Sequence, residues 1–363
     1  MKIMNVAGAR PNFMKVAPLI NAMSRHPGLQ LSLINTGQHY DHALSQLFFD
    51  ELNLPVPDRF LGIGSGSAAQ QIGRTMIEFE KVLEEIRPDL VVVVGDVNAT
   101  IACSLITARN RIKLAHVEAG LRSFDRTMPE EINRLLTDQL ADFLFTTEPV
   151  ARENLLREGI PSNKIHFVGN VMIDTLVKHR EQADRSSILA DLALSPAGYG
   201  LITLHRPGNV DDLPTLKGLL GGLETIQKDV PLVFPMHPRT RSRLESFGLS
   251  EMVSRMKGLQ IVDPLGYLDF LKLMSNARFV VTDSGGIQEE STILGIPCIT
   301  ARENTERPVT VELGTNEVVG TSPERIVAAC QQVIAGKWKK GKMPDLWDGN
   351  AAERIVRIIL DSP

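Results

Sequence analysis

Short apolar segments alternate with segments of helical periodicity along the whole chain, and this alternation restricts the fold more than any other feature. Residues 91–94 are four consecutive valines with no polar residue between them. Such a run is typical of a parallel strand that is buried on both faces of a sheet. The alternation therefore predicts an α/β protein with open parallel sheets and a helix between most successive strands.

The strands are predicted at the short apolar runs. They are 2–8, 31–37, 90–96, 113–119, 143–148 and 165–169 in the first half, and 200–205, 232–237, 260–263, 279–283, 297–300 and 317–320 in the second half. Helices are predicted at 70–87, 130–142 and 351–360. In the segment 130–142, the apolar side chains of Ile132, Leu135, Leu136 and Leu140 fall on one side of the helix, as in an amphipathic helix whose apolar side faces a core.

The length of the chain predicts two domains. At about 100–200 residues per domain, 363 residues correspond to two doubly wound domains of similar size. A polar stretch at 178–187 separates the two halves, so we place the boundary near residues 170–185.

Composition excludes several classes of protein. The 39 basic and 43 acidic residues give a net charge of −4, which argues against a nucleic-acid-binding surface across the molecule. No apolar run approaches the ~18 residues of a membrane helix, and the N-terminus lacks the pattern of a signal peptide. Cys103, Cys298 and Cys330 show no CxxC spacing and are expected to be reduced and mostly buried. We therefore expect a cytoplasmic protein with no nucleic-acid or membrane partner.

Titratable or amide side chains follow the predicted strands in both halves. The clusters are Gly8-Ala-Arg10, Gly37-Gln-His39, Gly95-Asp96, His116-Val-Glu118, His205-Arg206, His237-Pro238 and Asp283-Ser-Gly-Gly286. In open α/β sheets, ligands bind beyond the carboxyl ends of the strands. A single residue of this kind is often a cap or a turn former, but so many clusters predict a functional cleft between the domains.

The segment 282–290 predicts a phosphate site, because a strand, a glycine turn and a helix that opens near Gly286 follow one another. The amides and the dipole of a helix N-terminus favour a phosphate. Glu290 would repel phosphate but could accept hydrogen bonds from a ribose diol; acids at this position also simply complement the helix dipole. Arg307, Arg10 and Lys15 are the kind of cation that a diphosphate requires, although each alone is more often a surface charge.

Three carboxylates form a second constellation. Asp96 and Glu118 close predicted strands, and Glu130 opens the helix that begins near Pro129. Carboxylates crowded in a cleft acquire raised pKa values and can exchange protons with a substrate. The alternative, that the acid only complements the helix dipole, is strongest for Glu130, because acids are common in the first turn of a helix.

The sequence predicts neither a cofactor nor a metal. Residues 62–66, Gly-Ile-Gly-Ser-Gly, lack the GxGxxG spacing, and there is no Walker A motif. The histidines show no HExxH pattern or other paired-ligand spacing.

Several motifs occur together in a characteristic order. They are Gly8-Ala-Arg-Pro-Asn-Phe-Met-Lys15, Thr36-Gly-Gln-His39, Gly95-Asp96, His116-Val-Glu-Ala-Gly-Leu-Arg122, Pro129-Glu-Glu-Ile-Asn-Arg134, His205-Arg206, Asp283–Glu290 and Thr305-Glu-Arg-Pro308. In this combination the chain resembles the non-hydrolysing UDP-N-acetylglucosamine 2-epimerases over nearly its whole length. The resemblance implies a GT-B fold, with two Rossmann-like domains whose parallel sheets face a central cleft. The domains would be 1–172, joined by the C-terminal helix at 350–363, and a UDP-binding domain at 173–349.

The resemblance also implies an activity and a set of site residues. The activity is reversible conversion of UDP-N-acetylglucosamine to UDP-N-acetylmannosamine, by elimination of UDP to a 2-acetamidoglucal and re-addition, without a cofactor or metal. Asp96, Glu118 and Glu130 match the acid/base carboxylates of the family, and His205 matches a histidine near the diphosphate. The residues matched to substrate binding are Arg10, Lys15, His205 and Arg307 for the diphosphate, Ser284, Gly285 and Gly286 for the phosphates, Glu290 for the ribose, and Phe270 and Leu265 for the uracil. The resemblance also implies a homodimer, which is the usual oligomeric state in this family.

Alternatives remain beside this interpretation. A close relative acting on UDP-2,3-diacetamido-2,3-dideoxy-glucuronate shares the variants Gly-Ala-Arg-Pro and Gly-Gln-His-Tyr. A hydrolysing epimerase, a GT-B glycosyltransferase and a silent nucleotide-sugar sensor would share part of the pattern. The stretch 37–42 departs from the motif that forms a second, regulatory substrate site in bacterial members. For Phe270, the sequence without the resemblance favours core packing on a helix.

Overall fold

The computed structural model describes residues 1–37 and 42–362, without the side chains of residues 10 and 42–46. The chain divides into two compact units. Unit 1 comprises Met1–Lys178 and Asp345–Pro363, and unit 2 comprises His179–Pro344.

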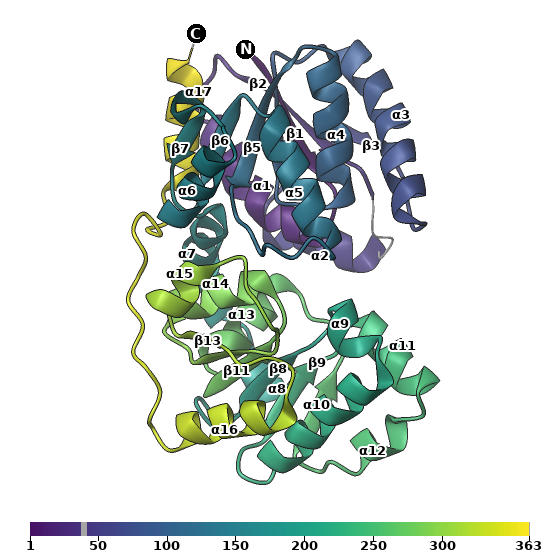
Figure 1. Cartoon of the computed structure of the whole chain (residues 1–363), viewed down its shortest axis with the longest axis vertical. Coiled ribbons are helices and arrows are strands. Elements are labelled where there is room, and N and C mark those ends of the chain that lie inside the picture. Colours follow the sequence, from purple (N-terminus) through teal and green to yellow (C-terminus); the bar gives the residue numbers. More distant parts are fainter. Residues whose placement is uncertain (38–41, 363) are drawn as a thin grey trace. The chain divides into compact units, whose positions relative to one another are not determined.

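In the described part of unit 1, seven parallel strands form one sheet (Figure 1). They are β1 (Lys2–Ala7), β2 (Gln30–Asn35), β3 (Arg59–Phe60), β4 (Leu90–Val94), β5 (Lys113–Ala119), β6 (Phe143–Thr146) and β7 (Ile165–Phe167). Their order is β3-β2-β1-β4-β5-β6-β7, so the direction of winding reverses between β1 and β4. Ligands of doubly wound sheets bind at such a switch point.

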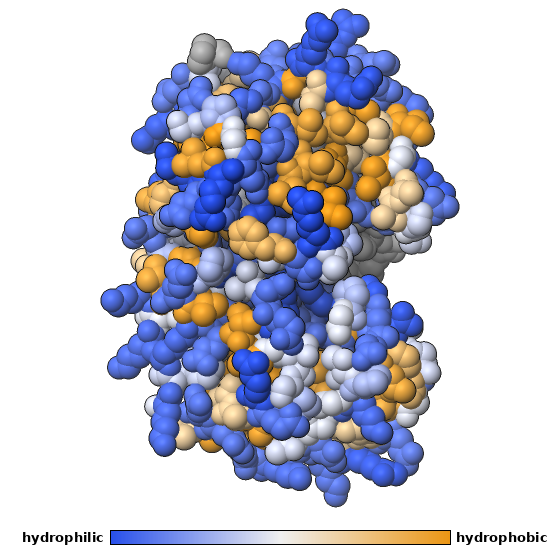
Figure 2. Space-filling view, in the orientation of Figure 1, coloured by the Kyte–Doolittle hydropathy of each residue, from blue (hydrophilic) through white to orange (hydrophobic). Residues whose placement is uncertain are grey.

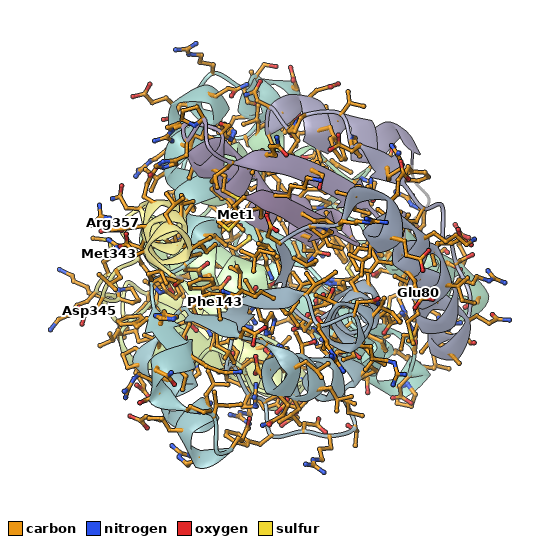
Figure 3. The ribbon with its side chains drawn as sticks, turned by 90° about the horizontal axis from the view of Figure 1, so that it is seen from above. Met1, Glu80, Phe143, Met343, Asp345 and Arg357 are labelled. Carbon is orange, nitrogen blue, oxygen red and sulfur yellow. The ribbon has the colours of Figure 1, made fainter. Side chains whose placement is uncertain are left out.

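Helices cover both faces of this sheet. They are α1 (Arg10–Met23), α2 (His42–Glu51), α3 (Ala68–Ile86), α4 (Asn98–Arg109), α5 (Pro129–Leu140), α6 (Pro149–Arg157) and α17 (Ala351–Asp361), with the 3-10 helix η1 (Ser162–Lys164); α7 (Val171–Asp184) continues into unit 2. Helix α1 packs against α17, whereas α4 packs between α3 and α5. From above, Glu80 on α3 and Arg357 on α17 lie on opposite sides of this unit (Figure 3).

Local sequence signals explain where these elements begin and end. All five residues of β4 are buried, as its unbroken apolar run predicts. At the start of α3, Ser67 and Gln70 form a capping box, in which the Gln70 amide donates to Ser67 Oγ at 3.3 Å and the Ser67 amide donates to Gln70 Oε1 at 3.0 Å. Helix α3 ends at Arg87 in the left-handed conformation.

The C-terminal segment belongs to unit 1. Trp347 is buried, and its Nε1–H donates to the Thr147 carbonyl at 2.9 Å. Asp174 accepts hydrogen bonds from the amides of Ala351 and Ala352, at 3.1 and 2.7 Å, and so caps the N-terminus of α17. Burial raises the pKa of Asp174 above its ordinary value, although these two amides counteract it.

Unit 2 repeats the same plan in its described residues with a six-stranded parallel sheet. Its strands are β8 (Gly200–Thr203), β9 (Leu232–Pro235), β10 (Leu259–Val262), β11 (Phe279–Thr282), β12 (Cys298–Thr300) and β13 (Asn316–Val318), and its helices are α8 (Ile188–Asp191), α9 (Pro207–Val210), α10 (Leu213–Ile226), α11 (Pro238–Ser246), α12 (Ser250–Ser254), α13 (Tyr267–Ser275), α14 (Gly285–Leu294), α15 (Pro308–Glu312) and α16 (Pro323–Ile334). The order β10-β9-β8-β11-β12-β13 is that of a Rossmann sheet, with its switch point between β8 and β11.

The predicted α/β architecture with parallel sheets is confirmed, and each predicted strand overlaps a strand of the structure. Strand β3 was not predicted, because Arg59–Phe60 is a two-residue edge strand with both side chains exposed, which leaves no periodic pattern. The polar stretch that follows residue 178 is helical as far as Asp184, since it consists mostly of good helix formers.

The orientation expected for α5 is wrong. Its apolar side chains Ile132 and Leu136 are 46% and 51% exposed, whereas Glu131, Arg134 and Asp138 are buried. The physical reason is that the buried polar side chains find charged and hydrogen-bonding partners at the ends of β4 and β5. The polar face of this helix therefore faces the interior.

Two other expectations concern the whole chain. Cys103, Cys298 and Cys330 are free and buried, as predicted. Among the described residues, no helix combines the length and the apolar character needed to cross a bilayer.

Candidate active site

The turn from β1 to α1 is fixed against the turn that follows β4. Asn12 Oδ1 accepts hydrogen bonds from the amides of Gly8 and Ala9, at 2.9 and 3.0 Å, and Asn12 Nδ2 donates to the Val94 carbonyl at 3.3 Å. Gly8 is required for this close approach, because a Cβ atom there would lie 2.6 Å from the Cβ of Ala99. The switch point of unit 1 is therefore a tightly held pair of turns.

Lys15 and Glu118 form a buried ion pair at this switch point. The Lys15 Nζ contacts Glu118 Oε2, and the two side chains are 9% and 3% exposed. Glu118 has φ of 74° at a register shift between β5 and β6, where it is the extra residue of a bulge. A left-handed conformation is costly for a residue with a side chain, and such strain is typical of positions whose side chain must point in one direction.

Asp96, in the turn after β4, is held by helix α5. Its Oδ2 contacts the Nη2 of Arg134, whose side chain is only 2% exposed. The Nη1 of the same guanidinium lies 2.9 Å from Glu131 Oε2. Asn133 Nδ2 donates to the Asp96 carbonyl at 2.9 Å. Both the side chain and the backbone of Asp96 are therefore held from one helix.

Glu130 lies in the first turn of α5, next to Glu131, and is half-buried. The structure therefore places the three predicted carboxylates on three neighbouring elements of unit 1: the β4–α4 turn, the end of β5 and the start of α5. Two buried cations, Lys15 and Arg134, lie among them. Proton-transfer groups held by buried counter-charges are typical of acid/base sites.

A fully buried network lies behind Glu118. His116 Nδ1 lies 2.6 Å from Asp138 Oδ1, and His116 Nε2–H donates to the Gly95 carbonyl at 2.8 Å. Asp138 Oδ2 accepts from the Gly120 amide at 3.1 Å and pairs with Arg122 at 2.7 Å. Burial would raise the pKa of Asp138, but His116 and Arg122 hold it below its ordinary value. The network fixes the backbone on both sides of Glu118.

In unit 2, Asp283 organises the switch point between β8 and β11. Its Oδ2 accepts from the amides of His205 and Arg206, both at 2.9 Å, and from Asn209 Nδ2 at 3.1 Å. Its Oδ1 lies 3.0 Å from His205 Nδ1. Burial would raise the pKa of Asp283, but His205 and the backbone amides hold it below its usual value. The buried Asp283 carboxylate therefore fixes the orientation of the His205 ring, which is itself half-exposed.

Helix α14 begins at the glycine turn that the sequence identified. Ser284 is its N-cap residue, and the guanidinium of Arg307 lies so close to Gly285 that an added Cβ would collide with it. Arg307 is buried, with its Nε 2.6 Å from Glu289 Oε1 and its Nη1 3.4 Å from Glu306 Oε2. A helix N-terminus with a fixed guanidinium beside it is a ready site for a phosphate group.

Glu290 lies within α14 and is buried. Its Oε1 accepts a hydrogen bond from the Tyr267 hydroxyl at 2.9 Å. Burial, with a smaller contribution from Glu289, raises the pKa of Glu290 to about 8, although the Tyr267 bond counteracts it. Near neutral pH, a carboxyl group with this pKa can accept hydrogen bonds from a polar ligand or, when protonated, donate one to it.

The remaining predicted residues fall into two groups. Leu265 and Phe270 are half-buried and lie just before and within α13, on either side of Tyr267, so Phe270 is not a fully buried core residue. Ser284 and Gly286 are half-buried in the first turn of α14. Arg10 opens α1, but its side chain lies outside the described part of the structure, as do residues 38–41 with the predicted cluster member His39.

Sequence reasoning missed the residues that support the site. Arg134 and Asp138 belong to a helix that was interpreted through its leucines, although Glu131, Arg134 and Asp138 are spaced i, i+3 and i+7 and so form a polar stripe. Asp283 was part of a strand-end cluster without a role of its own. No sequence signal pointed to Tyr267 as the partner of Glu290.

The described residues contain no cluster of three or more His, Cys, Asp or Glu side chains placed to hold a metal ion. The groups that the structure places at the two switch points are carboxylates, a histidine, buried cations and a helix N-terminus. Together with the fold, these groups define a class: an α/β protein of the GT-B type, with functional groups at the carboxyl ends of two Rossmann-like sheets.

Comparison with known proteins identifies the family within this class. The family model described as UDP-N-acetylglucosamine 2-epimerase matches residues 21–360. The UDP-N-acetylglucosamine 2-epimerase of Methanocaldococcus jannaschii is 44% identical over 364 residues, covering 99% of each chain. Its crystal structure in complex with UDP-GlcNAc and UDP has a TM-score of 0.93 and covers 100% of both chains. The UDP-2,3-diacetamido-2,3-dideoxy-D-glucuronate 2-epimerase of Pseudomonas aeruginosa is 39% identical over 362 residues, covering 99% of each chain. The chain belongs to the UDP-N-acetylglucosamine 2-epimerase family and is an isomerase-type enzyme.

Proposed function

We propose that the enzyme converts UDP-N-acetylglucosamine reversibly into UDP-N-acetylmannosamine, by elimination of UDP to a 2-acetamidoglucal and re-addition of UDP. The observation that carries the proposal is the placement of Asp96 and Glu118 at one switch point, each in contact with a buried cation. The M. jannaschii relative, whose solved structure contains UDP-GlcNAc and UDP, supports the choice of substrate.

The proposed diphosphate site uses the start of α14. The amides at Gly285 and Gly286 and the guanidinium of Arg307 would bind the phosphates, with His205 oriented toward them by Asp283. In unit 1, Arg10 and Lys15 are the cations that we propose to bind the diphosphate. Cations that bind the leaving diphosphate more tightly as its negative charge grows would speed departure of UDP.

The nucleoside end is proposed to lie along α13 and α14. Glu290 would accept hydrogen bonds from the ribose hydroxyls, with its carboxyl group held by Tyr267. Phe270 would lie beside the uracil ring, and the backbone of Leu265 would contact the base. A ring that is only half-buried retains a surface on which a base can stack.

The chemistry at carbon 2 explains why several carboxylates are needed. The C2 hydrogen is only weakly acidic, so departure of UDP must first build positive charge at the anomeric carbon, and nearby carboxylates stabilise this charge. A proton must then leave one face of the sugar and return to the other, which requires at least two titratable groups. Asp96, Glu118 and Glu130 are the proposed groups.

A second candidate substrate is UDP-2,3-diacetamido-2,3-dideoxy-glucuronate. The observation that favours it is the P. aeruginosa relative, which is named for this substrate and matches the chain over nearly its whole length. The same elimination would serve both sugars, because they differ away from the C1–C2 bond that reacts.

The deciding experiment is proton NMR of UDP-N-acetylglucosamine with the enzyme in D₂O, without added cofactor. We expect UDP-N-acetylmannosamine that carries deuterium at C2, with the UDP linkage intact. Free N-acetylmannosamine and UDP would show a hydrolysing enzyme instead. Turnover of the diacetamido-glucuronate nucleotide alone would establish the second candidate, and UDP binding without turnover of either sugar would overturn both.

We also propose that the enzyme is a cytoplasmic homodimer. Its dimer surface would be the α3/α5 surface, formed by the exposed side chains of Ile77 on α3 and of Ile132 and Leu136 on α5. Figure 2 shows apolar side chains gathered over α4 and α5 in unit 1. A cluster of exposed apolar side chains on the outer face of a packed helix layer is typical of an interface. A second copy of the chain is the partner that the family resemblance implies.

The variant Leu136→Glu should abolish dimer formation, because it places an unpaired charge in the proposed interface. Sedimentation velocity should show a dimer for the wild type and a monomer for the variant at the same concentration. Val56→Glu is the matched control, because Val56 is 88% exposed in unit 1 outside this surface. A monomeric wild type, or a variant that dimerises normally, would disprove the proposed surface.

The affinity for UDP should rise with pH if Glu290 binds the ribose. The pKa of Glu290 is about 8 in the free enzyme, so below that pH the carboxyl group must lose a proton before it can accept two hydrogen bonds. Affinity should therefore increase by up to about tenfold per pH unit on approaching pH 8 and then level off. Calorimetry should measure the UDP affinity of the wild type and of Glu290→Gln at several pH values. The protonation of the UDP phosphate affects both proteins equally, so the difference between them reports Glu290. Equal pH dependence in the two proteins would contradict the ribose role.

A further inference from the structure

Helix α5 buries a charged face and exposes an apolar one. Glu131, Arg134 and Asp138 have exposed fractions of 1%, 2% and 0%, and their spacing places them on one side of the helix. A buried charge is costly unless other charges or hydrogen bonds compensate it. The partners of these three side chains therefore show what the face is built to hold.

Glu131 and Asp138, at the two ends of this face, accept hydrogen bonds from backbone amides. Glu131 accepts hydrogen bonds from the Ser123 amide at 2.9 Å, the Ser123 hydroxyl at 3.0 Å and the Phe124 amide at 3.1 Å. Asp138 accepts from the Gly120 amide and pairs with His116. These two acids fix the chain on the C-terminal side of Glu118.

Arg134, between them, holds a functional side chain. One arm of its guanidinium contacts Asp96 Oδ2 and the other lies 2.9 Å from Glu131 Oε2. Glu131 already has three hydrogen-bond donors from the segment 123–124, so its charge is largely compensated without Arg134. The contact of Arg134 with Asp96 is therefore the one that acts on the proposed reaction centre.

Among the described residues, charged side chains from three elements lie around Asp96. Arg134 and Glu131 face it from α5. At the adjacent Gly95, an added Cβ would lie 3.0 Å from Lys15 Nζ on α1 and 3.8 Å from Glu118 Oε2 on β5, and His116 of β5 bonds to the Gly95 carbonyl. Among the described side chains, Lys15 is paired with Glu118, and Arg134 is a cation that contacts the carboxylate of Asp96.

We infer that Arg134 is a positioning residue that holds Asp96 as an oriented carboxylate for proton transfer. The inference rests on the proposed function, because it assigns Asp96 the state of a proton acceptor in that reaction. A guanidinium beside a carboxyl group favours its ionised form and fixes its orientation through a planar fork. Removing the guanidinium would remove the positive charge in contact with the Asp96 carboxylate, and this loss favours the protonated form of Asp96.

The test compares Arg134→Gln, which removes the charge, with Arg134→Lys, which keeps it. Carbon-13 NMR of proteins labelled at the aspartate carboxyl carbon follows Asp96, whose signal is assigned as the one missing from Asp96→Asn. We expect the titration midpoint of Asp96 to rise by about one to three pH units in Arg134→Gln and to remain near the wild-type value in Arg134→Lys. This readout does not depend on which reaction the enzyme catalyses.

Kinetics of C2 deuterium exchange provide the second readout. In Arg134→Gln we expect kcat to fall by roughly 10²-fold with little change in KM, since a displaced carboxylate costs rate more than binding. The acid limb of the pH–rate profile should move up with the NMR midpoint, and Arg134→Lys should recover part of the rate. Arg157→Gln, an exposed arginine of α6 that pairs with Glu153, is the control and should behave as the wild type.

The double variant Asp96→Asn/Arg134→Gln separates positioning from general structural support. If Arg134 acts through Asp96, the second substitution should cause little further loss of rate in the Asp96→Asn background. Independent losses that multiply, or an unchanged Asp96 midpoint in Arg134→Gln, would overturn the inference. A wild type that turns over neither sugar while the midpoint still shifts would instead overturn the proposed function and leave the effect of Arg134 on Asp96 standing.

Discussion

The variant Glu118→Gln is expected to lower the rate of epimerisation by roughly 10²-fold or more, the usual contribution of an acid/base group. Glutamine keeps the size of the side chain and can keep the bulged backbone, but it cannot carry a proton to or from C2. It also removes the negative charge that pairs with Lys15 in a buried position. The loss should therefore appear in kcat and in the exchange of the C2 hydrogen, with UDP affinity little changed.

Deuterium incorporation at C2 in D₂O is the measurement for this variant, alongside calorimetry with UDP. Glu153→Gln serves as the control, because Glu153 is an exposed acid on α6 in the same unit. Since Glu118 has φ of 74°, Glu118→Gly would relax the backbone strain and should be at least as stable as Glu118→Gln, yet equally inactive. Near-normal exchange in Glu118→Gln would remove Glu118 from the acid/base assignment.

The fold was largely predictable from the sequence because parallel strands leave a simple signal. Segments such as 90–94 are buried on both faces, so their apolar runs are unbroken and their ends are marked by polar residues. The rule that ligands bind at the carboxyl ends of such strands led to Asp96 and Glu118. The two-residue strand β3 escaped because so short an exposed edge strand has no such pattern.

The supporting residues were not predictable in the same way. Periodicity indicates which side of a helix is apolar. It does not indicate which side faces the interior when the interior holds charged partners for the polar side. Helix α5 shows this, since Arg134 is buried while Leu136 is exposed. The bulge that turns Glu118 and the bond from Tyr267 to Glu290 depend on residues distant in sequence, which a local pattern cannot link.

The variant Arg307→Ala should weaken UDP binding by roughly 10- to 100-fold, since a charge-assisted hydrogen bond to a phosphate contributes about 1.5–3 kcal/mol. The guanidinium is held against the first turn of α14 by Glu289 and Glu306, so it is already in place before the nucleotide arrives. A preorganised cation loses little conformational entropy on binding, which makes its removal more costly. Arg307→Lys should retain part of the affinity, because it restores the charge without the planar fork.

Calorimetry with UDP measures this effect, but Arg307→Ala also removes a buried cation that pairs with Glu289, which can destabilise unit 2, whereas Glu306 keeps its pair with Arg302. Gly285→Ala avoids that problem, because its added methyl group would displace the guanidinium from the helix N-terminus while the charge remains in the protein. Both variants should therefore lose affinity, whereas Arg255→Ala, at an exposed arginine that directly follows α12, should not. If Arg307→Ala and Gly285→Ala both bind UDP as the wild type does, the diphosphate cannot lie at the start of α14, and the proposed orientation of the substrate would be wrong.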